Sequence, residues 1–271
     1  MSIANGRKSI FITGAASGMG RETALLFAKN GWFVGGFDVQ EDLLTKLSDE
    51  IGAENCFVRR LDVTDREDYR AAIAAFAEAT GGKMDILYNN AGIGKGGMFA
   101  DQPFEDVLAL VQVNFVGVLI GIHEGIKLLK ATPGSLCFTT SSSSATFGMA
   151  GIAVYSATKH AVKGLTEALS IEFRAYGIKV ADVLPGLIDT PIIPREAIGA
   201  AQKEGMFRAI PAVEVAKVVW EAYTSDKLHW YVPPEIVALD HSASLEPEKT
   251  RDSMASGGIL ALLEAQRAAA A

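Results

Sequence analysis

Short runs of apolar residues alternate with amphipathic segments along most of the chain. Apolar runs of strand length lie at residues 9–13, 32–37, 56–61, 86–88, 135–140, 178–184 and 228–232. Apolar positions at helical spacing lie at residues 18–30, 41–50, 65–80, 107–130, 153–175 and 212–224. Strands this apolar are typical of parallel sheets that helices cover on both faces. The pattern therefore predicts right-handed β–α–β units in an α/β doubly wound parallel sheet.

The pattern loosens after Pro185. Residues 187–210 mix prolines with apolar and charged side chains, and residues from about 240 to 271 are polar before an Ala-rich end that predicts a helix. We find no internal repeat and no linker long enough to separate two folding units. A single domain over 1–271 is therefore expected, with about 240–271 as a C-terminal extension.

Composition and charge narrow the range of partners. Hydrophobic residues make up 49% of the chain and charged residues 21%, and the net charge is -7 without a basic cluster. Nucleic acid and anionic membrane surfaces are therefore not expected as partners. Cys56 and Cys137 lie within apolar runs, which indicates core packing, and neither a disulfide framework nor a metal site is expected.

One apolar stretch, 107–129, is long enough to resemble a membrane span. Polar residues interrupt it, and each would be expensive in lipid. These residues are Gln112, Asn114, His123, Glu124 and Lys127. A buried amphipathic helix explains the stretch better, and the first residues lack a secretory signal pattern. The expected location is therefore the cytoplasm.

Glycines punctuate the junction between the first strand and the first helix. The sequence there is TGAASGMG, with Gly14, Gly18 and Gly20. Such glycines allow a tight turn and let a pyrophosphate approach the backbone at the positive N-terminus of the helix. The loop predicts a Rossmann-type dinucleotide site. The alternative is a turn that only closes the helix onto the sheet.

Two aspartates end the second and third strands. A carboxylate at Asp38, about 20 residues beyond the glycine loop, can accept hydrogen bonds from the adenosine ribose hydroxyls and repels a 2′-phosphate. This charge favours NAD over NADP. Asp62 is placed to reach the adenine in a similar way. Both aspartates have a simpler interpretation, as caps of the helices that follow them.

Tyr155 and Lys159 are four residues apart in a helical stretch, so their side chains share one face. A free tyrosine has a pKa of about 10 and is a poor base at neutral pH. A lysine ammonium beside it, together with a positive nicotinamide ring, lowers that pKa. Tyr155 is thus a candidate acid–base group for an alcohol or a carbonyl, with a nearby serine holding the substrate oxygen.

The chain resembles the short-chain dehydrogenases/reductases over about residues 8–191. The motifs that carry the resemblance are TGAASGMG, the NNAG of 89–92, the VNFVG around Asn114, the serine run 141–144, YSATK from Tyr155, and the PGLIDT of 185–190. The resemblance implies a catalytic tetrad of Asn114, Ser142, Tyr155 and Lys159. Ser142 is chosen from the serine run because the family's serine precedes its tyrosine by thirteen residues, and 155 minus 13 is 142.

The resemblance also implies a set of cofactor contacts. Lys159 is expected to touch the nicotinamide ribose, and Asn114 to support a water-linked proton path to Lys159. The implied cofactor-binding residues are Gly14, Ser17, Gly18, Met19, Gly20, Asp38, Asp62, Val63, Asn90, Ala91, Gly92, Tyr155, Lys159, Pro185, Gly186, Ile188 and Thr190.

In this family the residues that cover the substrate follow the sixth strand, here about 187–210. The apolar residues of this expected lid are Ile192, Ile193, Ile198, Met206 and Phe207. They suit a hydrophobic secondary alcohol or ketone, although a lid also needs apolar residues simply to dock. The helices around Asn114 and Tyr155 resemble the faces that pair in family oligomers, so a homodimer or homotetramer is expected.

The expected function is NAD-dependent interconversion of an alcohol and its ketone by hydride transfer, on a small-molecule substrate. A catalytically silent NAD-binding regulatory or scaffold protein is the alternative from another class. An epimerase or dehydratase that uses NAD transiently is disfavoured, because no second α/β pattern follows Thr190.

Overall fold

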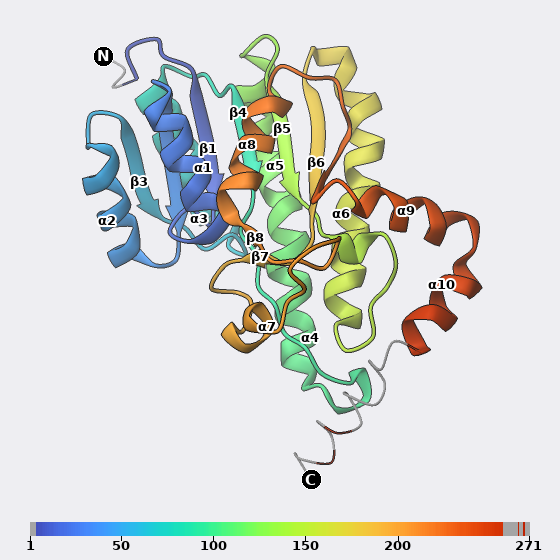
Figure 1. The fold of residues 1–271 in the computed structure, drawn as a ribbon. Coiled ribbons are helices and arrows are strands. Elements are labelled where there is room, and N and C mark those ends of the chain that lie inside the picture. Colours follow the sequence, from blue (N-terminus) through green and yellow to red (C-terminus); the bar gives the residue numbers. More distant parts are fainter. Residues whose placement is uncertain (1–3, 257–264, 266–267, 269–271) are drawn as a thin grey trace.

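The computed structural model describes residues 4–256, 265 and 268. Seven parallel strands form one sheet in the order β3-β2-β1-β4-β5-β6-β9 (Figure 1). The strands are β1 (Ser9–Thr13), β2 (Phe33–Asp38), β3 (Cys56–Arg60), β4 (Ile86–Asn89), β5 (Leu136–Thr140), β6 (Lys179–Pro185) and β9 (His229–Val232). The predicted doubly wound parallel sheet is confirmed. The chain leaves β1 toward one edge and returns to β4 on its other side, which opens a crevice between them.

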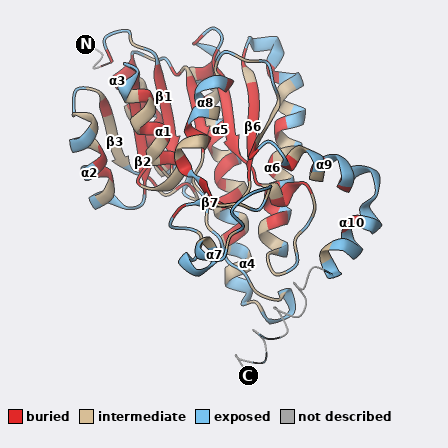
Figure 2. Ribbon diagram, viewed as in Figure 1, coloured by how far each residue is buried: buried red, intermediate tan, exposed pale blue. Residues whose placement is uncertain are grey.

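Helices cover both faces of the sheet. One face packs against α1 (Gly18–Lys29), α2 (Glu41–Ile51) and α8 (Ala212–Ala222), and the other against α3 (Arg66–Thr80), α5 (Gly117–Lys130) and α6 (Ala153–Glu172). Alternation within a strand divides the two cores, since Ile10 and Ile12 face the first layer and Phe11 faces the second. Figure 2 shows the central strands, such as β1 and β6, as continuously buried, whereas the edge strand β3 is only partly buried.

The predicted helix at 107–130 begins earlier and contains an irregular turn. It runs as α4 (Phe104–Val111), a π-helical turn at Gln112–Val116, and α5. The segment Phe104–Lys130 is long and apolar enough to cross a membrane, with a mean hydropathy of 1.8, and 33% of its most apolar stretch is buried. The expected burial therefore holds for one face only. That face packs on the sheet, and Glu124 on α5 pairs with Arg66 of α3.

The segment after β6 is more ordered than its sequence suggests. It contains β7 (Ile188–Asp189), α7 (Arg195–Gly199) and β8 (Ile210–Pro211), and β7 and β8 pair with each other. Two helices that we did not predict follow β9, namely α9 (Ile236–Leu245) and α10 (Pro247–Met254). Pro at the start of α10 suits the first helical turn, and the helix is polar because most of it is exposed (Figure 2). The predicted Ala-rich helix lies mostly outside the described residues.

Candidate active site

A cavity of about 300 Å³ lies in the crevice at the carboxyl ends of β1, β2 and β4. This is where an open α/β sheet binds ligands. Most of the predicted cofactor residues line it, namely Gly14, Ser17, Gly18, Met19, Asp38, Asp62, Val63, Asn90, Ala91, Gly92, Tyr155, Lys159 and Thr190. Val113 of the VNFVG motif and Ile192 of the expected lid also line this cavity. Gln40, Ile93 and Thr140 line it too; they belong to no predicted motif, and only the fold brings them to the cavity.

The glycine loop is shaped by close backbone approaches. Gly14 and Gly18 have positive φ angles, 67° and 52°, which favour glycine. A Cβ on Gly20 would lie 2.1 Å from the carbonyl oxygen of Gly14, and one on Gly14 would lie 2.9 Å from Ala91 Cα. The simpler interpretation, a turn that closes the helix onto the sheet, therefore holds for these two positions. The same loop also lines the cavity at the start of α1, so the turn and a cofactor site do not exclude each other.

Asn90 ties the loop to the end of β4. Its side-chain amide donates to the carbonyl oxygens of Thr13 (3.0 Å) and Gly14 (3.3 Å). Thr13 Oγ1 in turn accepts from the backbone N–H groups of Asn90 and Ala91, at 3.0 and 3.1 Å. The loop and the β4 end therefore form one rigid rim of the cavity.

Asp38 braces the same rim from β2. One carboxylate oxygen accepts from the backbone N–H of Ala16 (3.1 Å) in the glycine loop, and the other from the N–H of Gln40 (3.1 Å). The cap residue of α2 is Gln40, so the contact with its N–H is a local turn and not a helix cap. Arg60 lies beside Asp38 in the sheet register, a neighbour that sequence reasoning missed. Its guanidinium faces Glu41 and Asp68, at 3.9 and 3.8 Å.

Asp62 does not cap α3. That cap is Asp65, which accepts from the backbone N–H groups of Glu67 and Asp68. Asp62 instead accepts from the hydroxyl and the N–H of Thr64, at 2.7 and 2.9 Å, and these bonds hold the pKa of Asp62 below its ordinary value. The capping interpretation of Asp62 is therefore wrong, and its carboxylate remains at the cavity wall.

Lys159 is buried beneath Tyr155 on α6. Its Nζ donates to the carbonyl oxygen of Thr140 (2.8 Å) and lies 5.6 Å from the centroid of the Tyr155 ring. Burial lowers the pKa of Lys159 to about 8. Burial also raises the pKa of Tyr155, and a hydrogen bond with Ser142 opposes that shift. In the protein without cofactor, the pKa of Tyr155 is therefore raised and not lowered as predicted. Desolvation disfavours the phenolate more than the protein's own groups favour it.

The four adjacent serines have different surroundings. Ser141 donates its hydroxyl to the carbonyl oxygen of Lys159 (3.0 Å) and fastens α6 to the end of β5. Ser142 contacts Tyr155, and its Oγ accepts from the N–H of Ser144 (3.1 Å). Ser143 and Ser144 line a neighbouring cavity without a hydrogen bond from either hydroxyl to Tyr155. The structure therefore places Ser142 beside Tyr155.

Asn114 lies in the π-helical turn and is fully buried. Its side chain accepts from the N–H of Ile93 and donates to the carbonyl oxygen of Ile93, both at 2.9 Å. A Cβ on Gly92 would lie 3.2 Å from Asn114 Oδ1 and 3.8 Å from Lys159 Nζ, so a glycine there lets these groups meet. Asn114 does not line the cavity; the water-linked path stays a prediction.

A second cavity of about 560 Å³ adjoins the first, and Tyr155 and Ile192 line both. Ser142 lines the second cavity, and its other walls are mainly apolar. They come from Met149, Ile152, Leu187, Ile192, Ile193, Pro194, Met206, Phe207, Ile236 and Leu239. Four of the five predicted apolar lid residues are in this wall, and Ile198 is not. Ile236 and Leu239 belong to α9, which the sequence did not reveal as a helix.

Four predicted cofactor residues lie outside the first cavity. Gly186 lines the second cavity, whereas Gly20, Pro185 and Ile188 line neither. Ile188 is a core residue of β7, and Pro185 ends β6. Thr190, which follows β7, lies close to Gly18, since a Cβ added at Gly18 would lie 3.0 Å from Thr190 Cγ2.

Comparison with known proteins assigns the chain to a family. The model of the short chain dehydrogenase family matches residues 8–198. The chain belongs to this family, and it is an oxidoreductase of the short-chain dehydrogenase type.

Individual relatives agree with this assignment. The cyclohexanol dehydrogenase of Acinetobacter sp. (strain SE19) is 34% identical over 189 residues, 69% of this chain and 75% of that protein. The 2,5-dichloro-2,5-cyclohexadiene-1,4-diol dehydrogenase LinX of Sphingobium indicum is 39% identical over 189 residues, 68% and 74% of the two chains. A short-chain dehydrogenase/reductase from Burkholderia phymatum, solved in complex with NAD, superposes with a TM-score of 0.80 at 26% identity, covering 90% of this chain and 95% of that one.

Proposed function

We propose that this protein is an NAD-dependent dehydrogenase or reductase that interconverts a hydrophobic secondary alcohol and its ketone. The observation that carries the proposal is the position of Tyr155 on the wall shared by the two cavities. Lys159 lies on the side of the first cavity and Ser142 on the side of the second. The relatives named for cyclohexanol and for a ring diol support a cyclic, largely apolar substrate in the second cavity.

The residues divide the chemistry between them. A nicotinamide dinucleotide, when bound, accepts or supplies the hydride. Ser142 holds the substrate oxygen, and Tyr155 takes the hydroxyl proton of an alcohol or returns one to a carbonyl. The Lys159 ammonium favours the phenolate of Tyr155 electrostatically, and a positive nicotinamide ring acts in the same direction against the burial that raises the Tyr155 pKa.

The first cavity suits a dinucleotide with two free ribose hydroxyls. Gly14 and Gly18 line the cavity together with Ser17 and Met19 at the start of α1, where backbone N–H groups can receive a pyrophosphate. Asp38 brings a carboxylate to the same cavity, and Lys159 is the one cation among the described residues that line it. Arg60 is already paired with acidic groups. This charge distribution favours NAD over NADP, and the NAD complex of the Burkholderia relative is consistent with it.

The experiment that tests the proposal is a fluorescence titration with NADH and NADPH, followed by absorbance assays over a panel of cyclic secondary alcohols with NAD. Tight NADH binding and turnover of a panel member are expected. Tight binding without turnover of any alcohol would favour a silent NAD-binding protein. A preference for NADPH would refute the role of Asp38 alone, and the absence of binding to either cofactor would refute the proposal.

We also propose that the protein forms a homodimer or homotetramer and is located in the cytoplasm. Residues 1–271 fold as one domain, and residues 187–210 cover the substrate. Exposed apolar side chains on the long helix support an interface between copies, with Phe104 66% and Leu108 48% exposed. Ile171 on α6 is also exposed. Light scattering of the purified protein tests the assembly, since a monomeric mass at micromolar concentration would contradict it.

A further inference from the structure

Helix α9 is part of the wall of the second cavity. Ile236 and Leu239, in the first turns of α9, line the cavity, and Asp240 is the next residue. The helix lies beside α6 at the periphery of the molecule (Figure 1). Its position therefore affects the volume that a substrate can occupy, so whatever fixes α9 affects substrate binding.

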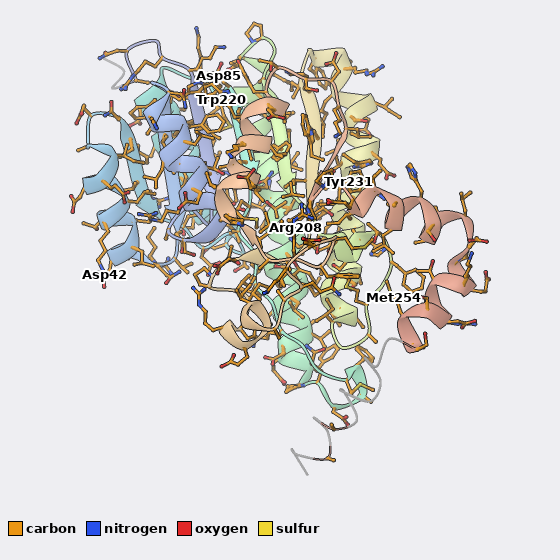
Figure 3. All side chains as sticks on the ribbon, viewed as in Figure 1. Asp42, Asp85, Arg208, Trp220, Tyr231 and Met254 are labelled. Carbon is orange, nitrogen blue, oxygen red and sulfur yellow. The ribbon has the colours of Figure 1, made fainter. Side chains whose placement is uncertain are left out.

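A charged cluster anchors α9 at Asp240. Lys163 Nζ lies 2.8 Å from each of the two carboxylate oxygens of Asp240. The hydroxyl of Tyr231 on β9, labelled in Figure 3, donates to the same carboxylate at 2.6 Å. The Lys163 and Asp240 side chains are only 17% and 10% exposed, so solvent screens this pair weakly.

Lys163 lies on the helix that carries the candidate catalytic groups. Tyr155, Lys159 and Lys163 follow one another at four-residue intervals along α6, so they form one stripe on the helix surface. Tyr155 and Lys159 face the cavities, and one turn later Lys163 reaches across to α9. The ion pair thus joins the helix that holds Tyr155 to the helix that closes the substrate cavity.

Neither partner lines a cavity, so their effect on substrate is indirect. Further contacts hold β9 against α6 beside the pair, since His229 Nε2 lies 3.4 Å from Glu167 on α6 and His229 Nδ1 lies 2.7 Å from Asp182 on β6. These contacts hold the strand, whereas the Lys163–Asp240 bridge is the ion pair that joins α6 to α9 in the part of the chain that the structure describes.

We propose that Lys163 and Asp240 are positioning residues for substrate binding, which set the distance between the wall formed by α9 and Tyr155. The proposal rests on the proposed function, because it assigns the second cavity to the substrate. It predicts that loss of the ion pair affects the binding of the alcohol but not the catalytic step or the binding of the cofactor. Loosening α9 weakens the binding of the alcohol, while Tyr155, Ser142 and the cofactor cavity keep their geometry because their own contacts are untouched.

The test uses Asp240→Asn, which keeps the size of the side chain and its bond from Tyr231, and Lys163→Met, which keeps its apolar stem. With NAD saturating, KM for the alcohol should rise about tenfold in either variant, with kcat and the NADH dissociation constant within about twofold of wild type. Asp240→Glu should restore most of the KM. The control is Glu214→Gln, which breaks the exposed pair with Lys217 on α8 and should leave KM unchanged.

Hydrogen exchange separates failure of this proposal from failure of the proposed function. Amides of 236–245 should exchange faster in Asp240→Asn than in wild type, whereas those of 153–172 should not, whether or not an alcohol is turned over. Faster exchange throughout the protein, or a parallel fall in kcat, would indicate a purely structural role and overturn the proposal. An unchanged KM would also overturn it. If wild type turns over no alcohol, the proposed function fails, and the exchange result still decides whether the pair fixes α9.

Discussion

Lys159 Nζ lies 2.8 Å from the main-chain carbonyl oxygen of Thr140, the last residue of β5. The ammonium is therefore held by the backbone of a central strand rather than by a flexible side chain. Ser141, the next residue along, returns the contact by donating to the carbonyl oxygen of Lys159. These two hydrogen bonds fix α6 to the end of β5. They thereby fix the position of Tyr155 on the wall that the two cavities share.

Ser141 and Ser142 should differ in what their loss affects. Ser142→Ala removes the hydroxyl beside Tyr155, so kcat/KM for the alcohol should fall about 10²- to 10³-fold; it also leaves the Ser144 N–H without its acceptor, so the free energy of unfolding should fall by about 1 kcal/mol. Ser141→Ala removes a buried hydrogen bond, so the free energy of unfolding should fall by about 1 kcal/mol. Steady-state kinetics and urea unfolding of both variants test this. If Ser141→Ala lost the greater activity, the placement of the family serine at Ser142 would be wrong.

The buried Lys159 makes stability depend on pH. Its pKa falls from 10.5 to about 8 on folding, because burial disfavours the ammonium. Between these values the unfolded chain holds a proton that the folded chain has lost, so this group makes stability rise with pH across that window. Below about pH 8 both states are protonated and the penalty is constant.

Comparison with Lys159→Met isolates this effect. The unfolding free energy of wild type relative to the variant should increase by about 3 kcal/mol between pH 7.5 and 10.5, because each pKa unit is worth about 1.36 kcal/mol. Denaturant unfolding across this range measures the difference. A constant difference would mean that Lys159 titrates normally in the folded protein.

The glycine loop should not tolerate a methyl group at Gly20. A Cβ there would lie 2.1 Å from the carbonyl oxygen of Gly14, so Gly20→Ala must displace the loop and weaken NADH binding by at least about tenfold. Gly164→Ala is the matched control, since a Cβ at this α6 position meets no atom within 4 Å. It should stabilise the protein by up to about 1 kcal/mol. Equal NADH affinity in Gly20→Ala would contradict the loop's role.

The charge of Asp38 should govern the choice of cofactor. Asp38→Asn keeps the shape of the side chain but removes the negative charge, so the preference for NADH over NADPH should shrink about tenfold, or roughly 1.4 kcal/mol. Asp42→Asn on the exposed start of α2 is the control for general charge. Titration of both variants with both cofactors measures the ratio. A ratio in Asp38→Asn equal to that of wild type would assign the preference elsewhere.

The sequence predicts the sheet well because its central strands are buried on both faces, and their apolar runs stand out against the helical periodicity between them. The choice of Ser142 among the four serines rested on the family resemblance alone, and the structure has this serine beside Tyr155. The π-helical turn at Gln112–Val116 could not be predicted, since Asn114 within it bonds the backbone of Ile93, a tertiary contact that no local pattern reveals.

Helices α9 and α10 were missed for a different reason. The residues of α10 are mainly polar, and α9 is held in place by partners far away in the chain, such as Lys163, that no local pattern reveals. The substrate wall formed by Ile236 and Leu239 was missed with them. The sequence also could not show how deeply Tyr155 is buried, and in the protein alone this burial raises its pKa.

Tyr155→Phe tests the central claim most directly. The substitution removes only the hydroxyl that meets Ser142, and leaves the ring against Lys159. With the best alcohol of the panel, kcat should fall about 10³-fold or more, while the NADH dissociation constant stays within about twofold of wild type. Turnover by Tyr155→Phe at the wild-type rate would contradict the account, because Tyr155 could then not be the group that moves the proton.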